Sequence, residues 1–548
     1  MKKTLILLLA LSTLPVVLAR EPYRLFSASD RYPRNVYLDV LHYRFQLTLN
    51  DENDQISGEA TVEVRFQKAA VSDFELDLVD RGANGKGMTV ESVTSEGKEI
   101  AFVHQNDRLR LQLPAPAQPN QKCAVRIVYR GIPEDGLIIS ANQHGDRTFF
   151  GDNWPNRARH WLPTVDHPSD KATCEFLVIA PNHYQVIANG AKVKETDLPA
   201  SRLTHWKESV PIPTKVMVIG VARFAVQQVG EVNGKPVQSW VYPQDREAGF
   251  YDYALALPIL QFMEQRIGPY AYEKLANVQS KTRYGGMENA SNIFYDEKTV
   301  TGKRTSEDLL AHEIAHQWFG DSASERDWHH VWLSEGFATY LTQAYLETTY
   351  GRERLVQGMT EARTKVLAYY QNTPDAPVVD TTVTDLNQLL NPNSYQKGAW
   401  VLHMLRRAVG EKSFWKGIRD YYQLYRDGNA LTTDFQRVME KTSGKDLAFF
   451  FQQWLFQAGQ PTLEGAWQYN TAEKKLLVEV KQVQRSGSLF RFPLEIGVYD
   501  AATKRLKTVT VEVDQMEHTF RIPLANAPAT VALDPDTWLL MKGTITRK

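Results

Sequence analysis

Apolar and polar residues alternate through much of the first third of the chain. Every second residue from Tyr43 to Leu49 is apolar, and after a polar turn at 50–54 the alternation resumes from Ile56 to Phe66. Shorter runs of the same kind follow at 74–78, 109–113, 125–129 and 176–179. A period of two is typical of strands. Many short strands separated by Gly, Pro and Asp turns predict an N-terminal β-sandwich-like domain over residues 20–209.

A helical spacing replaces the alternation over residues 210–459. After one apolar strand at 216–221, helical periodicity marks the segments 253–267, 306–319, 332–350, 395–409, 414–425 and 447–456. Two extended segments, 275–280 and 283–294, lead into the helix at 306–319. Alternation returns over residues 460–548 and predicts a second, smaller β-sandwich. The predicted fold is therefore multidomain α+β, with an α-rich domain between two β domains.

The N-terminus has the features of a targeting segment. Lys2-Lys3 precedes an apolar run at 5–18, and Val17-Leu18-Ala19 fits the small-residue rule for cleavage. The run is too short for a typical membrane span, although a retained N-terminal anchor is the alternative. We expect residues 1–19 to be a signal peptide and the protein to be exported, periplasmic or secreted, with no stable membrane span after cleavage.

Composition narrows the partners. Charged residues make up 23% of the chain and the formal net charge is −1, so the protein has no net electrostatic field that would attract nucleic acid. We also expect a monomer. Cys123 and Cys174 are the two cysteines of the sequence. They could pair in an oxidising compartment, or each could be a free cysteine on a buried strand. The sequence leaves both alternatives open.

The helix predicted at 306–319 carries the clearest chemical signal. His312 and His316 are four residues apart, so both imidazoles leave the same helix face, and Glu313 projects beside them. Thr305 or Ser306 is expected to cap this helix. Two imidazoles at this spacing can bind one zinc ion. An amphipathic core helix that happens to carry two histidines is the alternative.

A catalytic zinc needs a third protein ligand and one open position. Glu335 follows His316 after 18 intervening residues, which is enough for one connection and an antiparallel return helix. With water in the open position, Glu313 can accept a proton as that water attacks a carbonyl. His329 and His330 are rival ligands, but adjacent side chains point apart.

Three motifs together resemble one family. The pattern His312-Glu313-x2-His316-x18-Glu335, the segment Gly285-Gly286-Met287-Glu288-Asn289 and the segment 395–398 that begins with Tyr395 occur in the order and spacing of the zinc aminopeptidases that include aminopeptidase N and the leukotriene hydrolase. The resemblance to these gluzincin metallopeptidases implies a thermolysin-like fold for residues 210–459, one zinc ion on His312, His316 and Glu335, and peptide substrates with a free N-terminus.

The resemblance also implies roles for the remaining motif residues. Gly285-Gly286 lets an extended peptide approach and pair with the backbone of the segment 285–289. Glu288 would bind the α-ammonium of the substrate, so that one residue is removed from the N-terminus. Tyr395 would donate its phenol proton to the developing oxyanion.

The chain departs from the family pattern at a few positions. Asp152 and Trp154 stand where many members carry Gln or Glu; we expect Asp152 to help bind the α-ammonium and Trp154 to wall the pocket for the first side chain. Ser334 replaces a more usual Asn, with little effect expected. The sequence ends after the second sandwich, where many relatives continue into a helical domain, and a more open site is the expectation.

The main interpretation is an exported zinc-dependent aminopeptidase, and the motifs leave three alternatives. A bifunctional aminopeptidase and epoxide hydrolase would use the same metal site. An endopeptidase is disfavoured by Glu288. A peptide-binding protein without turnover is disfavoured because every catalytic position is intact.

Overall fold

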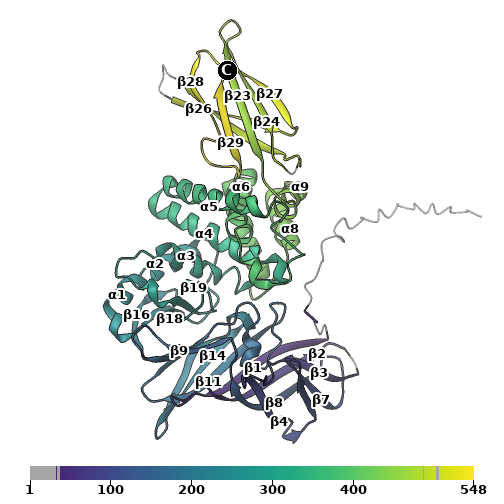
Figure 1. The fold of residues 1–548 in the computed structure, drawn as a ribbon, viewed down its shortest axis with the longest axis vertical. Coiled ribbons are helices and arrows are strands. Elements are labelled where there is room, and N and C mark those ends of the chain that lie inside the picture. Colours follow the sequence, from purple (N-terminus) through teal and green to yellow (C-terminus); the bar gives the residue numbers. More distant parts are fainter. Residues whose placement is uncertain (1–31, 34–36, 69, 486, 501–504) are drawn as a thin grey trace, which may run out of the picture.

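The computed structural model describes residues 32–33, 37–68, 70–485, 487–500 and 505–548, so the predicted signal peptide at 1–19 lies outside it. The described chain forms three parts that follow one another along the long axis of the molecule (Figure 1). A β-rich N-terminal part, a helical middle part and a C-terminal pair of sheets occur in the predicted order. The multidomain α+β fold is thus confirmed.

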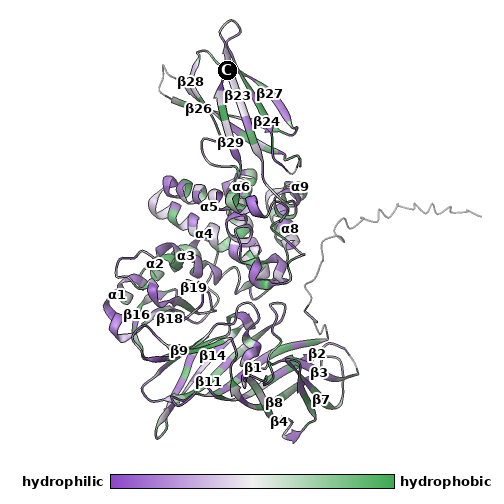
Figure 2. Ribbon diagram, viewed as in Figure 1, coloured by the Kyte–Doolittle hydropathy of each residue, from purple (hydrophilic) through white to green (hydrophobic). Residues whose placement is uncertain are grey.

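The N-terminal part is built on one large sheet and two smaller ones. Apolar and polar residues are interspersed along its strands (Figure 2), and Tyr43, Phe45 and Leu47 are fully buried, as the alternation predicts. The large sheet has the order β13(Ala191–Asp197), β14(Ser201–Pro213), β11(Lys171–Pro181), β1(Leu38–Thr48), β2(Ile56–Phe66), β8(Lys122–Ile132), β4(Gly87–Ser95) and β5(Lys98–Glu99). The smaller sheets have the orders β12(Gln185–Ala188), β15(Ile219–Ala222), β10(Arg147–Gly151), β9(Leu137–Ala141), and β3(Val71–Asp77), β7(Arg108–Ala117), β6(Phe102–Gln105). Position 210, where the middle domain was predicted to begin, lies within β14.

The strand order answers the question of the two cysteines. Cys123 lies on β8 and Cys174 on β11, and β1 and β2 run between these strands. Three strand spacings of about 4.8 Å separate the two positions, whereas a disulfide needs Cα atoms within about 7 Å. Both cysteines are free, and Cys174 is buried.

The middle part combines a sheet with a layer of helices. The sheet has the order β16(Ala225–Val232), β17(Lys235–Val241), β18(Leu275–Ser280), β20(Asn292–Asp296) and β19(Gly286–Met287), which leaves β19 at an edge. A further pair of strands consists of β21(Ala323–Glu325) and β22(Gly428–Ala430). The helices are α1(Arg246–Tyr253), α2(Ala256–Arg266), α3(Glu307–His316), α4(Trp332–Tyr350), α5(Arg352–Asn372), α6(Gly398–Val409), α7(Glu411–Tyr425), α8(Thr432–Ser443) and α9(Ala448–Phe451). Among the described helices, none is both long and apolar enough to cross a membrane.

Several of these elements differ from the sequence-based expectation. The strands β16 and β17 lie between the predicted strand at 216–221 and the first predicted helix at 253–267, where no element was predicted, and α5 and α8 were not predicted either. The helix α3 ends at His316, earlier than predicted, because the chain turns and Gly320 adopts a φ of 125°. Ser306 occupies the position before α3, but its hydroxyl donates to the carbonyl of Thr299 and does not cap the helix.

The C-terminal part forms the predicted smaller sandwich. One sheet has the order β27(Glu517–Pro523), β24(Lys475–Gln482), β23(Thr462–Asn470), β29(Lys542–Arg547), and the other β26(Arg505–Val513), β25(Phe492–Asp500), β28(Pro528–Leu533). Leu476, Val478 and Val480 of β24 and Leu494 and Ile496 of β25 are buried. The sandwich rests on the helical part through contacts with α6, of which the hydrogen bond between His403 Nε2 and the carbonyl of Thr537 (2.9 Å) is one.

Candidate active site

Three side chains on two neighbouring helices converge on one point. His312 and His316 lie on α3 and Glu335 lies in the first turn of α4. The Nε2 atoms of the two histidines are 3.0 Å apart, and each is 3.3 Å from Oε2 of Glu335. The predicted return helix therefore brings Glu335 back to the histidines across 18 intervening residues.

The spacing of these ligand atoms fits a tetrahedral zinc ion. Zinc bonds of about 2.0–2.1 Å place neighbouring ligand atoms about 3.3 Å apart in a tetrahedron. The separations of 3.0 and 3.3 Å match that value. Oε2 of Glu335 is buried, and apart from the two imidazole nitrogens it has no hydrogen-bond partner among the described residues, as expected for an atom that serves as a metal ligand.

His316 is oriented by contacts on its other ring nitrogen. Nδ1 lies 3.1 Å from the carbonyl oxygen of Phe319 and 3.0 Å from the hydroxyl of Ser334. An N–H on Nδ1 that donates to these oxygens leaves Nε2 free to bind a metal. Gly320 makes room for this arrangement, because a Cβ there would lie 2.3 Å from Oγ of Ser334. Ser334, expected to matter little, thus contacts His316, one of the predicted metal ligands.

Glu313 is seated against backbone that has no side chain. A Cβ on Gly286 would lie 2.4 Å from Oε1 of Glu313, so only glycine fits at this position of β19. Gly285 is different, because a Cβ there would meet only Leu309 at 3.8 Å. Burial, and then the carboxylates Glu288 and Glu335, raise the pKa of Glu313 well above its ordinary value.

Glu288 follows the edge strand and faces the same point. Its Oε1 is buried without a hydrogen-bond partner among the described residues. One of its carboxylate oxygens lies within 4.8 Å of a carboxylate oxygen of Glu313 and of a ring nitrogen of His316. Gln317, directly after the second histidine, donates from its amide to the backbone carbonyl of Glu288 (2.6 Å) and so fixes it relative to α3. The motif around the histidines did not reveal this role of Gln317.

Tyr395 reaches the site from a π-helical turn, Asn393–Lys397, that leads into α6. Its ring stacks on His312, with centroids 5.9 Å apart and planes 13° apart. Gly336 of α4 and Gly398 of α6 meet where a Cβ would approach backbone to 2.9 Å, which brings the turn close to Glu335. Burial and the carboxylates of Glu335 and Glu288 raise the pKa of Tyr395 well above its ordinary value, so the phenol keeps its proton.

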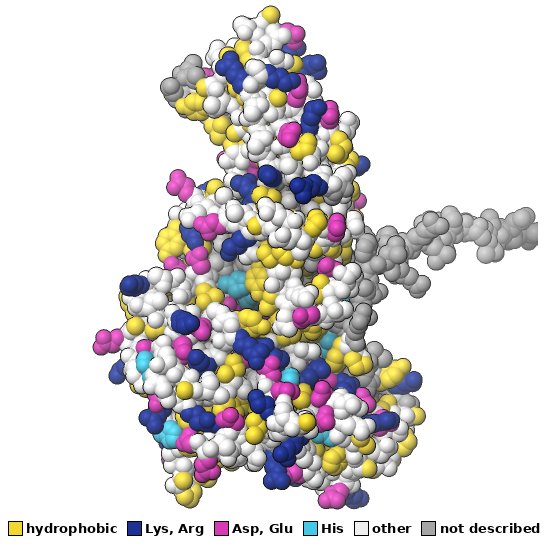
Figure 3. All heavy atoms as spheres, viewed as in Figure 1, with side chains coloured by type: hydrophobic (Ala, Val, Ile, Leu, Met, Phe, Trp, Pro, Cys, Tyr) yellow, Lys and Arg dark blue, Asp and Glu magenta, His cyan; other side chains and the backbone are white. Residues whose placement is uncertain are grey.

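These groups line a cavity of about 320 Å³. Its wall also includes Trp154, Tyr284, Met287 and Leu390, so the N-terminal part contributes to it. Trp154 occupies the wall position that the sequence suggested for it and packs edge-on against Tyr284 with centroids 6.2 Å apart. Figure 3 shows histidine side chains reaching the surface in the middle of the face drawn, at the level of α3 in Figure 1.

Asp152 is tied to neighbouring parts of the chain by both of its carboxylate oxygens. It is fully buried, and Arg157 pairs with one of its oxygens. The other oxygen accepts hydrogen bonds from the hydroxyl of Thr282 (3.1 Å) and the backbone N–H of Arg283 (2.9 Å). These contacts anchor the segment that leads into Gly285 and Gly286, and Asp152 is not in the cavity wall, so its contact with an α-ammonium stays a prediction.

The remaining candidate residues differ in whether they line the cavity. Met287 is buried and lines the cavity, whereas Asn289 is fully buried but not in its wall. His329 points at Asp327 and at the carbonyl of Val383, and Nδ1 of His330 contacts the hydroxyl of Thr432. The two rival histidines are therefore engaged away from His312 and His316.

Comparisons with known proteins agree with this geometry. A family model described as the peptidase family M1 domain matches residues 251–454, and one described as the peptidase M1 N-terminal domain matches residues 40–216. The chain belongs to peptidase family M1. The first match contains the histidines, Glu335 and Tyr395, and the second contains Trp154.

Individual relatives of this M1 chain are distant in sequence. The thyrotropin-releasing hormone-degrading ectoenzyme of Rattus norvegicus is 26% identical over 92% of this chain and 50% of its own, and the glutamyl aminopeptidase of the same organism is 27% identical over 60% and 36%. The chain thus spans half the length or less of these curated relatives. An M1 zinc metallopeptidase from Deinococcus radiodurans has a similar crystal structure, with a TM-score of 0.66 and 25% identity over 78% of this chain and 95% of that one.

Proposed function

We propose that this M1 chain is a zinc-dependent aminopeptidase that removes the N-terminal residue from peptides with a free N-terminus. The observation that carries the proposal is Glu288 at the end of the edge strand β19: a carboxylate oxygen lies within 4.8 Å of a ring nitrogen of His316, and Oε1 is buried without a hydrogen-bond partner among the described residues. A carboxylate so placed can accept from an α-ammonium and limits the substrate to one residue beyond the bond that is cut.

The edge strand supplies the track for the substrate. β19 pairs with β20 on one side only, so its other side can take an extended peptide as an added strand. Gly286 keeps that strand close to Glu313. The peptide bond after the first residue then lies near His312, His316 and Glu335.

Each remaining residue has one task in the reaction. When bound, zinc supplies a Lewis acid that lowers the pKa of water and polarises a carbonyl. Glu313 accepts a proton from the attacking water and delivers it to the leaving amine. Tyr395, protonated and stacked on His312, donates to the oxyanion that forms on the substrate carbonyl.

The negative charges of the cavity support binding of one zinc ion together with one ammonium group. Glu288, Glu313 and Glu335 bring three carboxylates to a cavity whose histidines bind metal in the neutral form. Burial lowers the pKa of His316, but the neighbouring carboxylates, led by Glu335, outweigh burial and raise that pKa to about 10. One Zn²⁺ and one α-ammonium would balance the three carboxylates.

The test is hydrolysis of a panel of aminoacyl-p-nitroanilides, each beside its N-acetylated twin, with and without a zinc chelator. We expect chelator-sensitive cleavage of the free-amine substrates only. Cleavage of both twins would indicate an endopeptidase. Absence of cleavage with zinc demonstrably bound would indicate a peptide-binding protein, and turnover of an epoxide beside the anilides would add the bifunctional alternative.

We also propose that the protein is exported and then acts as a monomer. The support for export is the sequence pattern of Lys2-Lys3, the apolar run at 5–18 and Val17-Leu18-Ala19. Expression of the full chain in a bacterium, followed by N-terminal sequencing of the protein from the periplasm and the medium, tests this. A mature chain that starts at Arg20 is expected, and an uncleaved chain in the cytoplasm would contradict export.

A further inference from the structure

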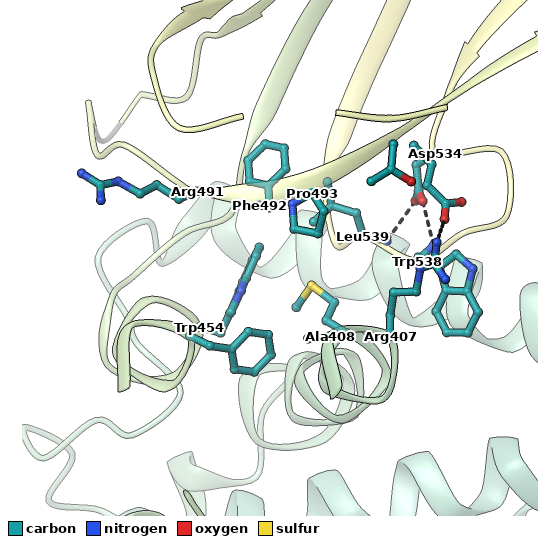
Figure 4. A pocket seen from close by; sticks show the side chains of 13 residues that line it. Arg407, Ala408, Trp454, Arg491, Phe492, Pro493, Asp534, Trp538 and Leu539 are labelled. Atoms are coloured by element: carbon teal, nitrogen blue, oxygen red, sulfur yellow. Dashed lines mark hydrogen bonds and ion pairs between the residues drawn. The ribbon is translucent and has the colours of Figure 1, made fainter. Parts of the chain in front are cut away.

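A second cavity lies where the C-terminal sandwich meets the end of α6 (Figure 4). It encloses about 530 Å³ of space between the atoms, part of which is open to solvent. Among the described residues, it shares no lining residue with the catalytic cavity. Its apolar wall includes Met404, Phe450, Trp454, Phe492, Pro493 and Leu539.

A buried carboxylate faces this apolar wall. On β25 the neighbours Leu494 and Ile496 are core residues of the sandwich, so Glu495 between them leaves the opposite face of the strand, toward α6. Glu495 is 6% exposed. One of its oxygens pairs with Arg407, and the other, Oε2, is buried without a hydrogen-bond partner among the described residues.

The other charged groups of the cavity are already committed. Each oxygen of Asp534 accepts from a backbone N–H, of Trp538 at 2.8 Å and of Leu539 at 3.0 Å. The guanidinium of Arg491 lies 5.3 Å from the ring of Phe449, and Figure 4 shows the side chain directed away from the cavity. The atom left without a hydrogen bond inside the cavity is therefore an acceptor, Oε2 of Glu495, and a ligand that satisfies it must carry a donor.

We propose that this cavity is a binding site for a small organic cation with an apolar body, such as a hydrophobic primary amine. The ammonium donates to Oε2 of Glu495, and the apolar body packs on Trp454, Phe450 and Met404. A buried carboxylate and nearby aromatic rings favour a cation over a neutral molecule of the same shape. Neither the resemblance nor the proposed reaction requires this site.

The walls of the cavity are held in place by contacts between the two parts of the chain. The side-chain amide of Gln453 accepts from the backbone N–H of Arg491 (2.8 Å) and donates to its carbonyl (3.1 Å). The backbone N–H of Leu540 contacts Sδ of Met404 at 3.5 Å. Because both parts supply walls, an occupant stabilises their docked arrangement.

The experiment is calorimetric titration of the zinc-loaded full-length protein with 2-phenylethylamine, beside neutral 2-phenylethanol and anionic 3-phenylpropanoate. The amine can also enter the catalytic cavity, so the titration is run in wild type and in a Glu288→Gln variant that weakens that site. We expect two amine sites in wild type, and one in Glu288→Gln that prefers the amine to the alcohol by about tenfold or more.

Two variants then locate the remaining site. Glu495→Gln in the Glu288→Gln background should weaken it by about tenfold or more, and Ala408→Phe, which fills the cavity, should abolish it while Glu495 stays in place. With Glu288 intact, both substitutions should leave anilide hydrolysis unchanged, which shows that the protein is folded. Equal affinity for the amine and the alcohol, or an affinity that neither variant changes, would overturn the proposal.

Discussion

At the scale of single residues, two adjacent glycines have different reasons to be glycine. A methyl group on Gly286 would overlap the carboxylate of Glu313, whereas one on Gly285 would make an ordinary contact with Leu309. We expect Gly286→Ala to displace Glu313 and to lower kcat/KM for an aminoacyl-p-nitroanilide by about a hundredfold or more, because a misplaced general base costs at least that much.

Gly285→Ala is the matched control for this prediction. Its methyl group has room, so any loss reflects only the approach of the substrate backbone. We expect a much smaller decrease in kcat/KM, with an unchanged zinc content in both variants. Equal losses from the two substitutions would show that Glu313 is not seated against Gly286.

Ser334 provides a second prediction at this scale. Its hydroxyl lies 3.0 Å from Nδ1 of His316, and the carbonyl of Phe319 shares that nitrogen at 3.1 Å. We expect Ser334→Ala to weaken zinc binding by up to about tenfold, since second partners of ligating histidines typically account for 10–100-fold and one partner remains. Competition with a chromophoric chelator measures the affinity, and an unchanged affinity would contradict a role for Ser334.

The residue scale also shows what the sequence could predict. The spacing of His312, His316 and Glu335 predicts their convergence, because helical geometry and one return helix leave few alternatives. Asp152 could not be assigned in this way, since its partners Thr282 and Arg283 are 130 residues away along the chain. Contacts across such separations depend on tertiary packing, which no local pattern encodes.

At the scale of elements, the turn that carries Tyr395 is anchored by a buried lysine. Nζ of Lys397 donates to the hydroxyl of Tyr370 on α5 (2.9 Å) and to the carbonyl of Gly459 (2.8 Å). Burial lowers the pKa of Lys397 to about 7. The side chain thus holds the turn with hydrogen bonds, and its positive charge is costly there.

This anchoring predicts a dependence of stability on pH. In the unfolded chain the pKa of lysine is about 10.4, so between pH 7 and pH 10 the unfolded state binds more protons at Lys397 and the free energy of unfolding rises with pH. Below pH 7 both states are protonated and the penalty is constant. Relative to Lys397→Met, wild type should therefore gain on the order of 2 kcal/mol between pH 7 and pH 9.

Denaturant unfolding of both proteins at pH 7, 8 and 9 measures this difference, and groups common to the two proteins cancel. Lys412→Met, at an exposed position of α7, is the control and should track wild type across the same range. Parallel curves for wild type and Lys397→Met would contradict the lowered pKa of the buried lysine.

The predicted helices and strands matched the observed ones where the hydrophobic periodicity was strong and isolated. The bounds of α4 and β18 coincide with the predicted segments at 332–350 and 275–280. The missed helix α5 buries Leu355, Met359, Ala362 and Val366, a spacing of three and four residues that the sequence does contain. The strand β16 could not be recognised so easily, because its apolar residues Ala225, Val226, Val229 and Val232 do not alternate regularly with polar ones.

At the scale of the whole molecule, Trp538 fastens the C-terminal sandwich to the helical part. Its ring stacks on His403 of α6, with centroids 4.6 Å apart and planes 11° apart. The guanidinium of Arg352 covers the ring at 4.2 Å. Aromatic stacking and a cation over the ring each stabilise such a contact by about 0.5–1.5 kcal/mol beyond area burial.

We expect Trp538→Ala to loosen the sandwich without dismantling the metal site, because the ligands on α3 and α4 contact neither Trp538 nor its partners. Removing a large aromatic side chain from a packed contact costs about 3 kcal/mol, enough to raise the open population of the interface more than a hundredfold.

Limited proteolysis should therefore cut faster between 457 and 461, where the chain passes from the helical part into β23, while bound zinc stays constant. Leu424→Ala, which shortens an exposed side chain of α7, should be cut at the wild-type rate. Loss of zinc in step with cleavage of Trp538→Ala would mean that the sandwich and the catalytic part unfold together as one cooperative unit.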